Sequence, residues 1–282
     1  MLHKKQVAVI SLVILLMLAL YSLDIKSLIK SEENTKPNSE IDRKSSFVIS
    51  LEIASERAKQ TLNANLIQQI TDLENALQRA SAIEKLKLQK QLAQKWDDVN
   101  MPAPSAFYDE LIADTENTYP SWIKVGDKFT NAYQASQDSV MQPALIQKAI
   151  IAFQNAQKLQ PSSLDAKIGL GVAYVSGTPD PMKGVALLLD VVKQEPGNIK
   201  ANMSLGLFSM KSGQYEKAVN RFKTVLSQVN KPDAWFYLAT SYENIGKKDE
   251  AIASYIKTKE LAADPGMSQF VDRKVNELKK VN

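Results

Sequence analysis

The chain has 282 residues, a net charge of +4, a single histidine at position 3 and no cysteine. This composition excludes disulfides and thiolate metal sites, and it leaves no histidine for acid–base chemistry or metal binding beyond the N-terminal tail. Basic and acidic residues are interspersed, so no cationic face of the kind that binds nucleic acid is visible. We expect one or two domains and no cofactor, metal or nucleic-acid partner.

Residues 1–25 predict a transmembrane signal anchor. The uncharged run at residues 7–23, at about 1.5 Å per residue, would make a helix slightly shorter than a ~30 Å hydrocarbon core. Lys4 and Lys5 precede this run and the charges after it nearly cancel, so the N-terminus should stay cytoplasmic. We therefore expect a single-pass protein of the bacterial inner (cytoplasmic) membrane whose C-terminal bulk is periplasmic. A cleaved signal peptide is the alternative, but the small–x–small cleavage motif is absent after Leu18.

Residues 26–46 are polar and lack apolar periodicity, so they predict a linker. Residues 47–117 predict a helical segment, because neither glycine nor proline occurs between Phe47 and Trp96. Apolar residues fall seven apart in two series there: Leu66, Leu73 and Ala80, and Ile70 and Leu77. This spacing favours a long helix that forms a coiled coil over about two to three heptads, with the register lost at Glu84.

Two interpretations of this segment are open. In the first, the coiled coil joins copies of the chain into a homo-oligomer through residues 47–96. In the second, the helix packs on the chain's own repeats and turns a set of apolar residues to that core: Ile83, Leu86, Leu92 and Trp96.

A short amphipathic helix is predicted at residues 106–116, after Pro102 and Pro104. Its inward residues would be Phe107 and Leu111, with Ile112 beside them.

The strongest signal is a pattern that occurs twice between residues 205 and 255, with a period of 33 residues. The matched positions are Leu205 and Leu238, Gly206 and Ala239, Gly213 and Gly246, Ala218 and Ala251, Val219 and Ile252, and Phe222 and Tyr255. Small residues let two helices approach, a glycine ends the first helix, and an aromatic ring fills the space beside the small residue. Such helix pairs stack, because a single pair cannot bury its apolar face alone.

The second copy resembles the tetratricopeptide repeat, a helix–turn–helix unit of about 34 residues. It reads Trp235-x2-Leu238-Ala239-x2-Tyr242, followed by Gly246, Ala251 and Tyr255. Weaker copies begin Lys167-x2-Leu170-Gly171-x2-Tyr174 and, with an insertion of about ten residues, Trp122-x2-Val125-Gly126-x2-Phe129. We expect firm repeats at about 198–231 and 232–264, within a repeat region at 118–282.

A capping helix is predicted at residues 267–281, because the end of a solenoid needs a polar outer face. Its apolar stripe comprises Phe270, Val271, Val275 and Leu278, whereas Lys274, Lys279 and Lys280 should face water. The expected fold is therefore all-α: a transmembrane helix, a long helix or coiled coil, and a tetratricopeptide-like solenoid with a C-terminal capping helix.

The resemblance implies that the first helices of the repeats line a concave groove that binds other proteins or peptides. The candidate groove residues are Lys200, Met203, Leu207, Met210, Lys211, Phe236, Thr240, Glu243 and Asn244. Methionine and aromatic side chains there suit an apolar or adaptable peptide, although Met203 and Leu207 can equally belong to the core. Some tetratricopeptide proteins clamp a terminal carboxylate with Lys and Asn; this groove has Lys200 but lacks the Asn and Arg partners.

No catalytic residues are predicted. Adjacent carboxylates occur at Asp97-Asp98 and Asp109-Glu110, but neighbours on a helix point about 100° apart and do not share a site. We therefore expect a non-catalytic, membrane-anchored scaffold or chaperone-like adaptor that exposes its repeats to the periplasm. The alternatives are a cytoplasm-facing regulatory adaptor, which would lack the zinc-binding cysteine module of such proteins, and an oligomeric structural scaffold.

Overall fold

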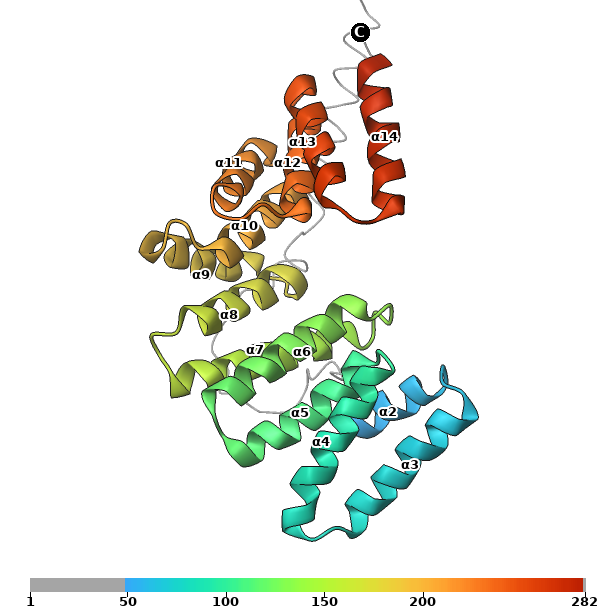
Figure 1. Cartoon of the computed structure of the whole chain (residues 1–282). Coiled ribbons are helices and arrows are strands. Elements are labelled where there is room, and N and C mark those ends of the chain that lie inside the picture. The colour runs from blue at the N-terminus through green and yellow to red at the C-terminus, as the bar shows by residue number, and fades with distance from the viewer. Residues whose placement is uncertain (1–48, 281–282) are drawn as a thin grey trace, which may run out of the picture. The chain divides into compact units, whose positions relative to one another are not determined.

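The computed structural model describes residues 49–280, which form thirteen α-helices and no β-strand (Figure 1). The helices are α2 (Leu51–Lys59), α3 (Ala64–Arg79), α4 (Ala82–Asp98), α5 (Pro102–Glu116), α6 (Tyr119–Ala135), α7 (Gln142–Leu159), α8 (Leu164–Gly177), α9 (Pro181–Gln194), α10 (Ile199–Lys211), α11 (Tyr215–Leu226), α12 (Pro232–Asn244), α13 (Lys248–Leu261) and α14 (Pro265–Lys280). The predicted anchor and polar linker lie outside these residues. From residue 49 to residue 280, no helix combines the length and apolarity needed to span a bilayer.

The prediction of one long helix before the repeats is wrong, because this segment forms three helices, α2, α3 and α4. Short polar side chains cap the new helix starts: the Asn63 carboxamide accepts a hydrogen bond from the backbone N–H of Leu66 at 3.0 Å. The Glu84 carboxylate accepts bonds from the backbone N–H and the hydroxyl of Ser81, at 3.0 and 2.7 Å. Glu84, which only ended the heptad pattern in the sequence, therefore helps to start α4.

The heptad seam of α3 packs within the chain. Ile70 is fully buried, and Leu73 and Leu77 pack against the cluster that contains Leu92 and Trp96 of α4. This arrangement agrees with the second interpretation for Leu92, Trp96 and the half-buried Leu86. The expectation for Ile83 is wrong, because 89% of its surface is exposed. The spacing that suggested a coil between copies is thus used between two helices of one chain.

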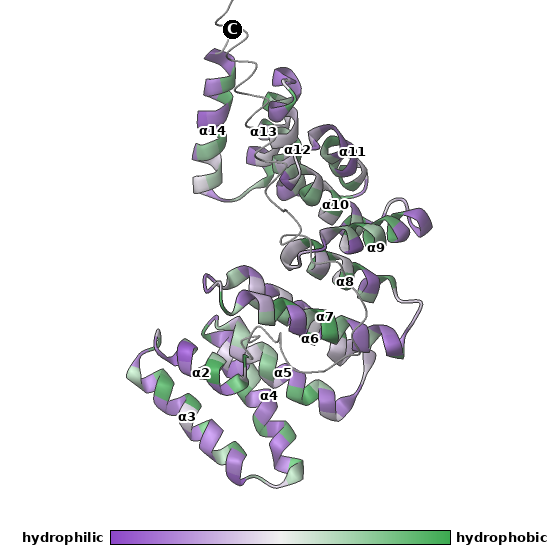
Figure 2. Ribbon diagram, turned by 180° about the vertical axis from the view of Figure 1, so that it is seen from behind, coloured by the Kyte–Doolittle hydropathy of each residue, from purple (hydrophilic) through white to green (hydrophobic). Residues whose placement is uncertain are grey.

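From α6 onward the helices pack as successive pairs: α6 with α7, α8 with α9, α10 with α11, and α12 with α13. The small residues predicted at the contacts, Ala218 and Ala251, have no exposed surface, and the rings of Phe222 and Tyr255 are buried beside them. Most helices carry both hydrophobic and hydrophilic residues, as expected for helices with one buried face (Figure 2). The two copies of the pattern therefore fold as two similar helix pairs.

The weaker copies also form helix pairs. The segment between α6 and α7 covers residues 136–141, inside the region where the sequence required an insertion. Phe153 of α7 lies against two glycines: a Cβ added to Gly126 of α6 or Gly169 of α8 would come within 2.5 or 2.3 Å of its ring. These glycines let α6 and α8 approach the Phe153 ring from two sides.

Two expectations at the ends of the repeat region need correction. Helix α5 starts at Pro102 and buries Phe107 and Ile112, but Leu111 is 37% exposed, so its predicted inward position is wrong. In α14, Val271 is buried and Phe270 packs on the same cluster, as expected. Lys274 does not simply face water, because its Nζ lies 2.7 Å from the Glu243 Oε1 atom of α12.

Candidate protein-binding groove

A hollow of about 370 Å³ crosses the first helices of three successive pairs, α6, α8 and α10. Its apolar lining includes Ile123, Ile168, Val172 and Met203. Its charged lining comprises Asp127, Asp165 and Lys200. Two of the nine candidate groove residues, Lys200 and Met203, thus line one hollow, together with residues of α6 and α8 that the sequence analysis did not select.

The repeat period brings the charged residues together. Asp165 and Lys200 stand at the N-terminal ends of α8 and α10, 35 residues apart in the sequence. The Lys200 Nζ atom lies 3.0 Å from the Asp165 Oδ1 atom, and both side chains are largely exposed. An exposed ion pair of this kind contributes only about 0–1 kcal/mol to stability, so it can be exchanged for contacts to a ligand at little cost.

Asp127 brings a second carboxylate to the hollow. Asp127 is exposed by its accessible surface, but the loss of water around it in the hollow raises its pKa; the Lys200 ammonium opposes this effect and the Asp165 carboxylate adds to it. The Lys200 ammonium bonds to Asp165, so it acts on Asp127 through its field. The hollow therefore holds one carboxylate more than it holds cations, above an apolar floor.

The remaining candidates on α10 lie elsewhere. Met210 is half-buried, and together with Met203 it packs against the cluster that contains Ala218 and Phe222. Leu207 is 37% exposed, and Lys211 is exposed at the end of the helix. Met203 thus belongs both to the edge of the core and to the lining of the hollow.

Two of the four candidates on α12, Phe236 and Glu243, contact the C-terminal helix. The ring of Phe236 lies 5.7 Å from that of Phe270, centroid to centroid. The Glu243 carboxylate accepts a hydrogen bond from the Tyr255 hydroxyl at 2.7 Å and pairs with Lys274. Two other candidates bond within α12: the Thr240 hydroxyl to the Phe236 carbonyl at 3.0 Å, and the Asn244 amide to the Thr240 carbonyl at 2.8 Å. Helix α14 therefore occupies the α12 part of the predicted groove.

One aspartate from each of the two adjacent carboxylate pairs, Asp97 and Asp109, contributes to a shared ion-pair cluster. Asp97 of α4 and Asp109 of α5 both face Lys128 of α6, which bonds to Asp97 and lies 3.6 Å from the Asp109 Oδ2 atom. The Lys124 Nζ atom lies 2.6 Å from the other Asp109 oxygen. Within residues 49–280 no group of three or more histidine, aspartate or glutamate side chains is arranged to hold a metal ion. This cluster ties three helices together by ion pairs.

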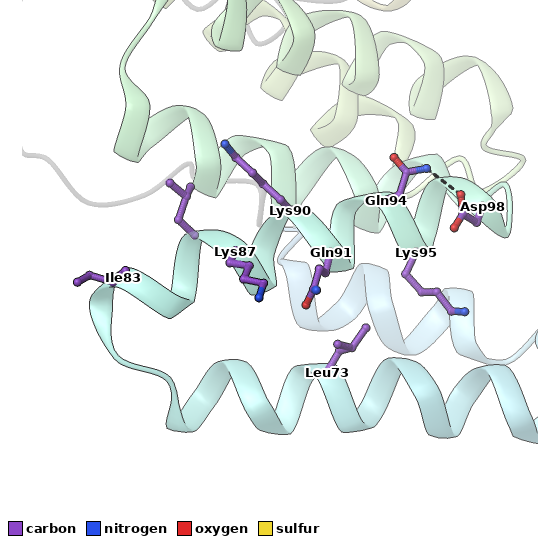
Figure 3. A pocket seen from close by; sticks show the side chains of 9 residues that line it. Leu73, Ile83, Lys87, Lys90, Gln91, Gln94, Lys95 and Asp98 are labelled. Atoms are coloured by element: carbon purple, nitrogen blue, oxygen red, sulfur yellow. Dashed lines mark hydrogen bonds between the residues drawn. The ribbon is translucent and has the colours of Figure 1, made fainter.

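A separate cleft lies between α3 and α4, and it was not anticipated from the sequence (Figure 3). It has a volume of about 750 Å³. Leu73, Ile83 and Leu86 supply its apolar surface, and three lysines of α4 surround them. The one available signal was the position of Ile83 directly after the Ser81 helix cap, which leaves it without a preceding helical turn to pack against.

Stacked helix pairs held by small residues and buried aromatic rings define a helical-repeat protein. The family model of the tetratricopeptide repeat matches residues 233–262, which cover α12 and α13. Residues 233–262 therefore form a tetratricopeptide repeat, as the sequence resemblance implied.

A solved structure with a TM-score above 0.5 has a similar fold. A tetratricopeptide repeat protein from Parabacteroides merdae ATCC 43184 is 12% identical, with a TM-score of 0.55 over 82% of this chain and 85% of that one. MamA residues 41 to the end from Desulfovibrio magneticus RS-1 are 19% identical, with a TM-score of 0.45 over 62% of this chain and 94% of that one. No curated protein matches the sequence. Similarity at this level of identity concerns the fold alone.

Proposed function

We propose that the protein is a non-catalytic scaffold that holds a segment of another protein in the hollow across α6, α8 and α10. The observation that carries this proposal is the lining of the hollow, where apolar side chains of three successive repeats meet beside two carboxylates and a lysine. Side chains from separate repeats, held on rigid helices, form a surface suited to an extended peptide. The excess carboxylate favours a segment with an apolar side chain next to a basic one.

Site-specific crosslinking in cells tests this function. A photoreactive amino acid would replace Val172, which lines the hollow, and in a control protein it would replace Ala253, which is exposed on α13. We expect crosslinks to a defined protein from position 172 and none to that protein from position 253. The purified partner should then bind Asp165→Lys more weakly than wild type while the melting curve is retained, because the Asp165 side chain is largely exposed. Equal crosslinking at the two positions would contradict the groove.

We further propose that this scaffold is anchored in the bacterial inner membrane and exposes its repeats to the periplasm. The support is the uncharged run at residues 7–23 with lysines before it. Alkaline phosphatase fused to the C-terminus should be active in cells, and a β-galactosidase fusion at the same site should be inactive. The reverse pattern would favour the cytoplasm-facing adaptor instead.

A further inference from the structure

The cleft between α3 and α4 presents apolar side chains that the rest of the repeat region does not cover. Figure 3 shows Leu73 rising from α3 toward α4, and Ile83 at the start of α4, beyond the end of α3. Leu73 is half-buried, and Ile83 is 89% exposed. An isolated exposed isoleucine needs no explanation, but here it continues an apolar strip along a cleft of about 750 Å³.

Positive charge surrounds this strip. Lys87, Lys90 and Lys95 line the cleft, and Asp98 is its one carboxylate. Asp98 lies at the far end of the cleft, and its carboxylate accepts a hydrogen bond from the Gln94 amide at 2.7 Å. The charge of the cleft is therefore strongly positive around an apolar centre.

The lysines are available to a ligand to different degrees. No carboxylate of residues 49–280 lies within ion-pair distance of Lys87. The Glu84 carboxylate interacts electrostatically with Lys87 but is hydrogen-bonded to Ser81. Lys90 pairs with Glu116 at 2.8 Å but keeps 54% of its side chain exposed. Lys95 bonds to the neutral Gln69 side chain at 2.5 Å. A carboxylate brought into the cleft would therefore meet two lysines, Lys87 and Lys95, that have no carboxylate partner within residues 49–280, and a third, Lys90, that is already paired.

We propose that this cleft binds an acidic amphipathic helix of a partner protein. The lysines extend over nine residues of α4, from Lys87 to Lys95, or about 12 Å along the helix, which matches about two turns of a ligand helix. Such a helix would place its apolar side chains on Leu73, Ile83 and Leu86, and its carboxylates on the lysines. This surface is separate from the hollow across α6, α8 and α10, so the two could be occupied at the same time.

Two other occupants fit less well. A second copy that used the same face across a two-fold axis would oppose lysines to lysines, which costs association energy. A membrane surface would reach Ile83 but not Leu73, which lies between the two helices in Figure 3. The concave shape and the charge together favour a helix over a bilayer or a second copy.

Selection from a displayed library of helical peptides tests the proposal on the full-length protein. The library would carry random residues at every position of an 18-residue helical scaffold, so it favours no charge in advance. We expect recovered sequences to be enriched in Asp and Glu on one face and in Leu, Ile or Phe at i, i+3 and i+7 on the other. Recovery of neutral or basic sequences alone would overturn the proposal.

Charge reversal in the cleft then separates it from other surfaces. The double variant Lys87→Glu/Lys90→Glu should lower the affinity for a recovered acidic peptide by about fivefold or more, because each exposed ion pair contributes up to ~1 kcal/mol. Lys193→Glu, an exposed lysine of α9, is the matched control and should leave the affinity unchanged. Replacing the peptide's glutamates by lysines should restore binding to the double variant. Equal affinity for wild type and the double variant would overturn the assignment.

The remaining outcomes identify a different occupant. Ile83→Asp should weaken binding of the recovered peptide without changing the sedimentation coefficient of the protein. If Ile83→Asp instead converts an oligomer to a monomer and no acidic peptide is recovered, the cleft is a contact between copies. If anionic phospholipid vesicles bind wild type more tightly than they bind Lys87→Glu/Lys90→Glu, and the recovered peptides do not remove this difference, the helix-binding assignment fails. Met203→Glu in the hollow should affect none of these measurements.

Discussion

Gly206 of α10 lies directly against the ring of Phe222 in α11: a Cβ atom at position 206 would come within 2.6 Å of the Phe222 Cε1 atom. The same relationship recurs one period later, where Ala239 of α12 and Tyr255 of α13 are both buried. The ring of one helix and the small residue of the other are thus complementary parts of each contact. This pair of positions is what makes the period visible in the sequence.

Gly206→Leu should destabilise the protein by about 1–3 kcal/mol or more, because the added side chain must displace the Phe222 ring. Ala218→Trp, at a position with no exposed surface, should have the same effect. Ala253→Leu on the exposed face of α13 is the control and should change the urea midpoint little. Unfolding monitored by circular dichroism measures all three, and wild-type stability of Gly206→Leu would contradict the packing of α10 on α11.

Gly213→Ala should lower the free energy of unfolding by about 1 kcal/mol for a different reason, namely the backbone conformation at residue 213. Gly213 has φ +73°, and no heavy atom lies within 4 Å of where its Cβ would be. The cost is therefore torsional and not steric, so Gly213→Asn should lose less stability than Gly213→Ala, since asparagine tolerates this region better. Gly246, with φ +74°, should behave in the same way. Equal losses for Ala and Asn would argue against this explanation.

Lys128→Met should destabilise the repeat region by about 1–3 kcal/mol, because the Lys128 ammonium bonds to Asp97 and to the Ser105 hydroxyl and lies 3.6 Å from the Asp109 carboxylate, which is only 2% exposed. Lys124→Met is the matched control on the same carboxylate, and its side chain is 57% exposed. We expect the smaller loss from Lys124→Met, since Lys124 bonds to Asp109 from an exposed position, whereas the less exposed Lys128 also bonds to Asp97 and Ser105. The double variant Asp109→Asn/Lys128→Met should recover part of the loss, and a double-mutant cycle of urea midpoints would measure it.

Asp127→Asn should stabilise the protein at neutral pH. The loss of water around Asp127 raises its pKa in the folded state, so its ionisation opposes folding, and stability is lost as pH rises through the raised value. The benefit of asparagine should vanish below the unfolded pKa of about 3.9. Melting temperatures between pH 3 and pH 7 would show this, and a constant difference would contradict it.

Asp190→Asn is the counterpart with the opposite sign. The hydrogen bond from Lys167 lowers the pKa of Asp190, so its ionised form supports folding above the unfolded pKa, and that support is lost as pH falls. Asp190→Asn should therefore lower stability slightly at pH 7 and have no effect at low pH. Stability changes of opposite sign for Asp127→Asn and Asp190→Asn at pH 7 would confirm that the local environment of each carboxylate, and not the net charge of the protein, controls the effect.

The helix pairs could be predicted from the sequence because their determinants are local and repeated. Ala218, Ala251 and the two turn glycines each act within a single unit, and the unit recurs at a fixed spacing. The segment before the repeats could not be predicted in the same way. The heptad spacing of Leu66 to Leu77 fits a partner helix of any origin, and only the caps at Asn63 and Ser81 decide that the partner is α4 of the same chain.

The candidate groove was predicted in part for a related reason. The period identified Lys200 and Met203 on the exposed side of a first helix, and they do line a hollow. Phe236 and Glu243 occupy equivalent places on α12, but α14 packs against them. Asp127 and Asp165 were not selected, because the sequence analysis drew its candidates from the two firm repeats alone.

Spacing along the chain therefore determined the helix pairs of the two firm repeats and which small residues meet large rings, since these follow from sterics within one repeat. Tertiary structure alone decided which outward side chains share a hollow, which part of it the last helix fills, and where three lysines surround an apolar cleft. The physical reason is that a period fixes a side chain's position on its own helix, whereas a binding surface depends on how separate helices are placed against one another.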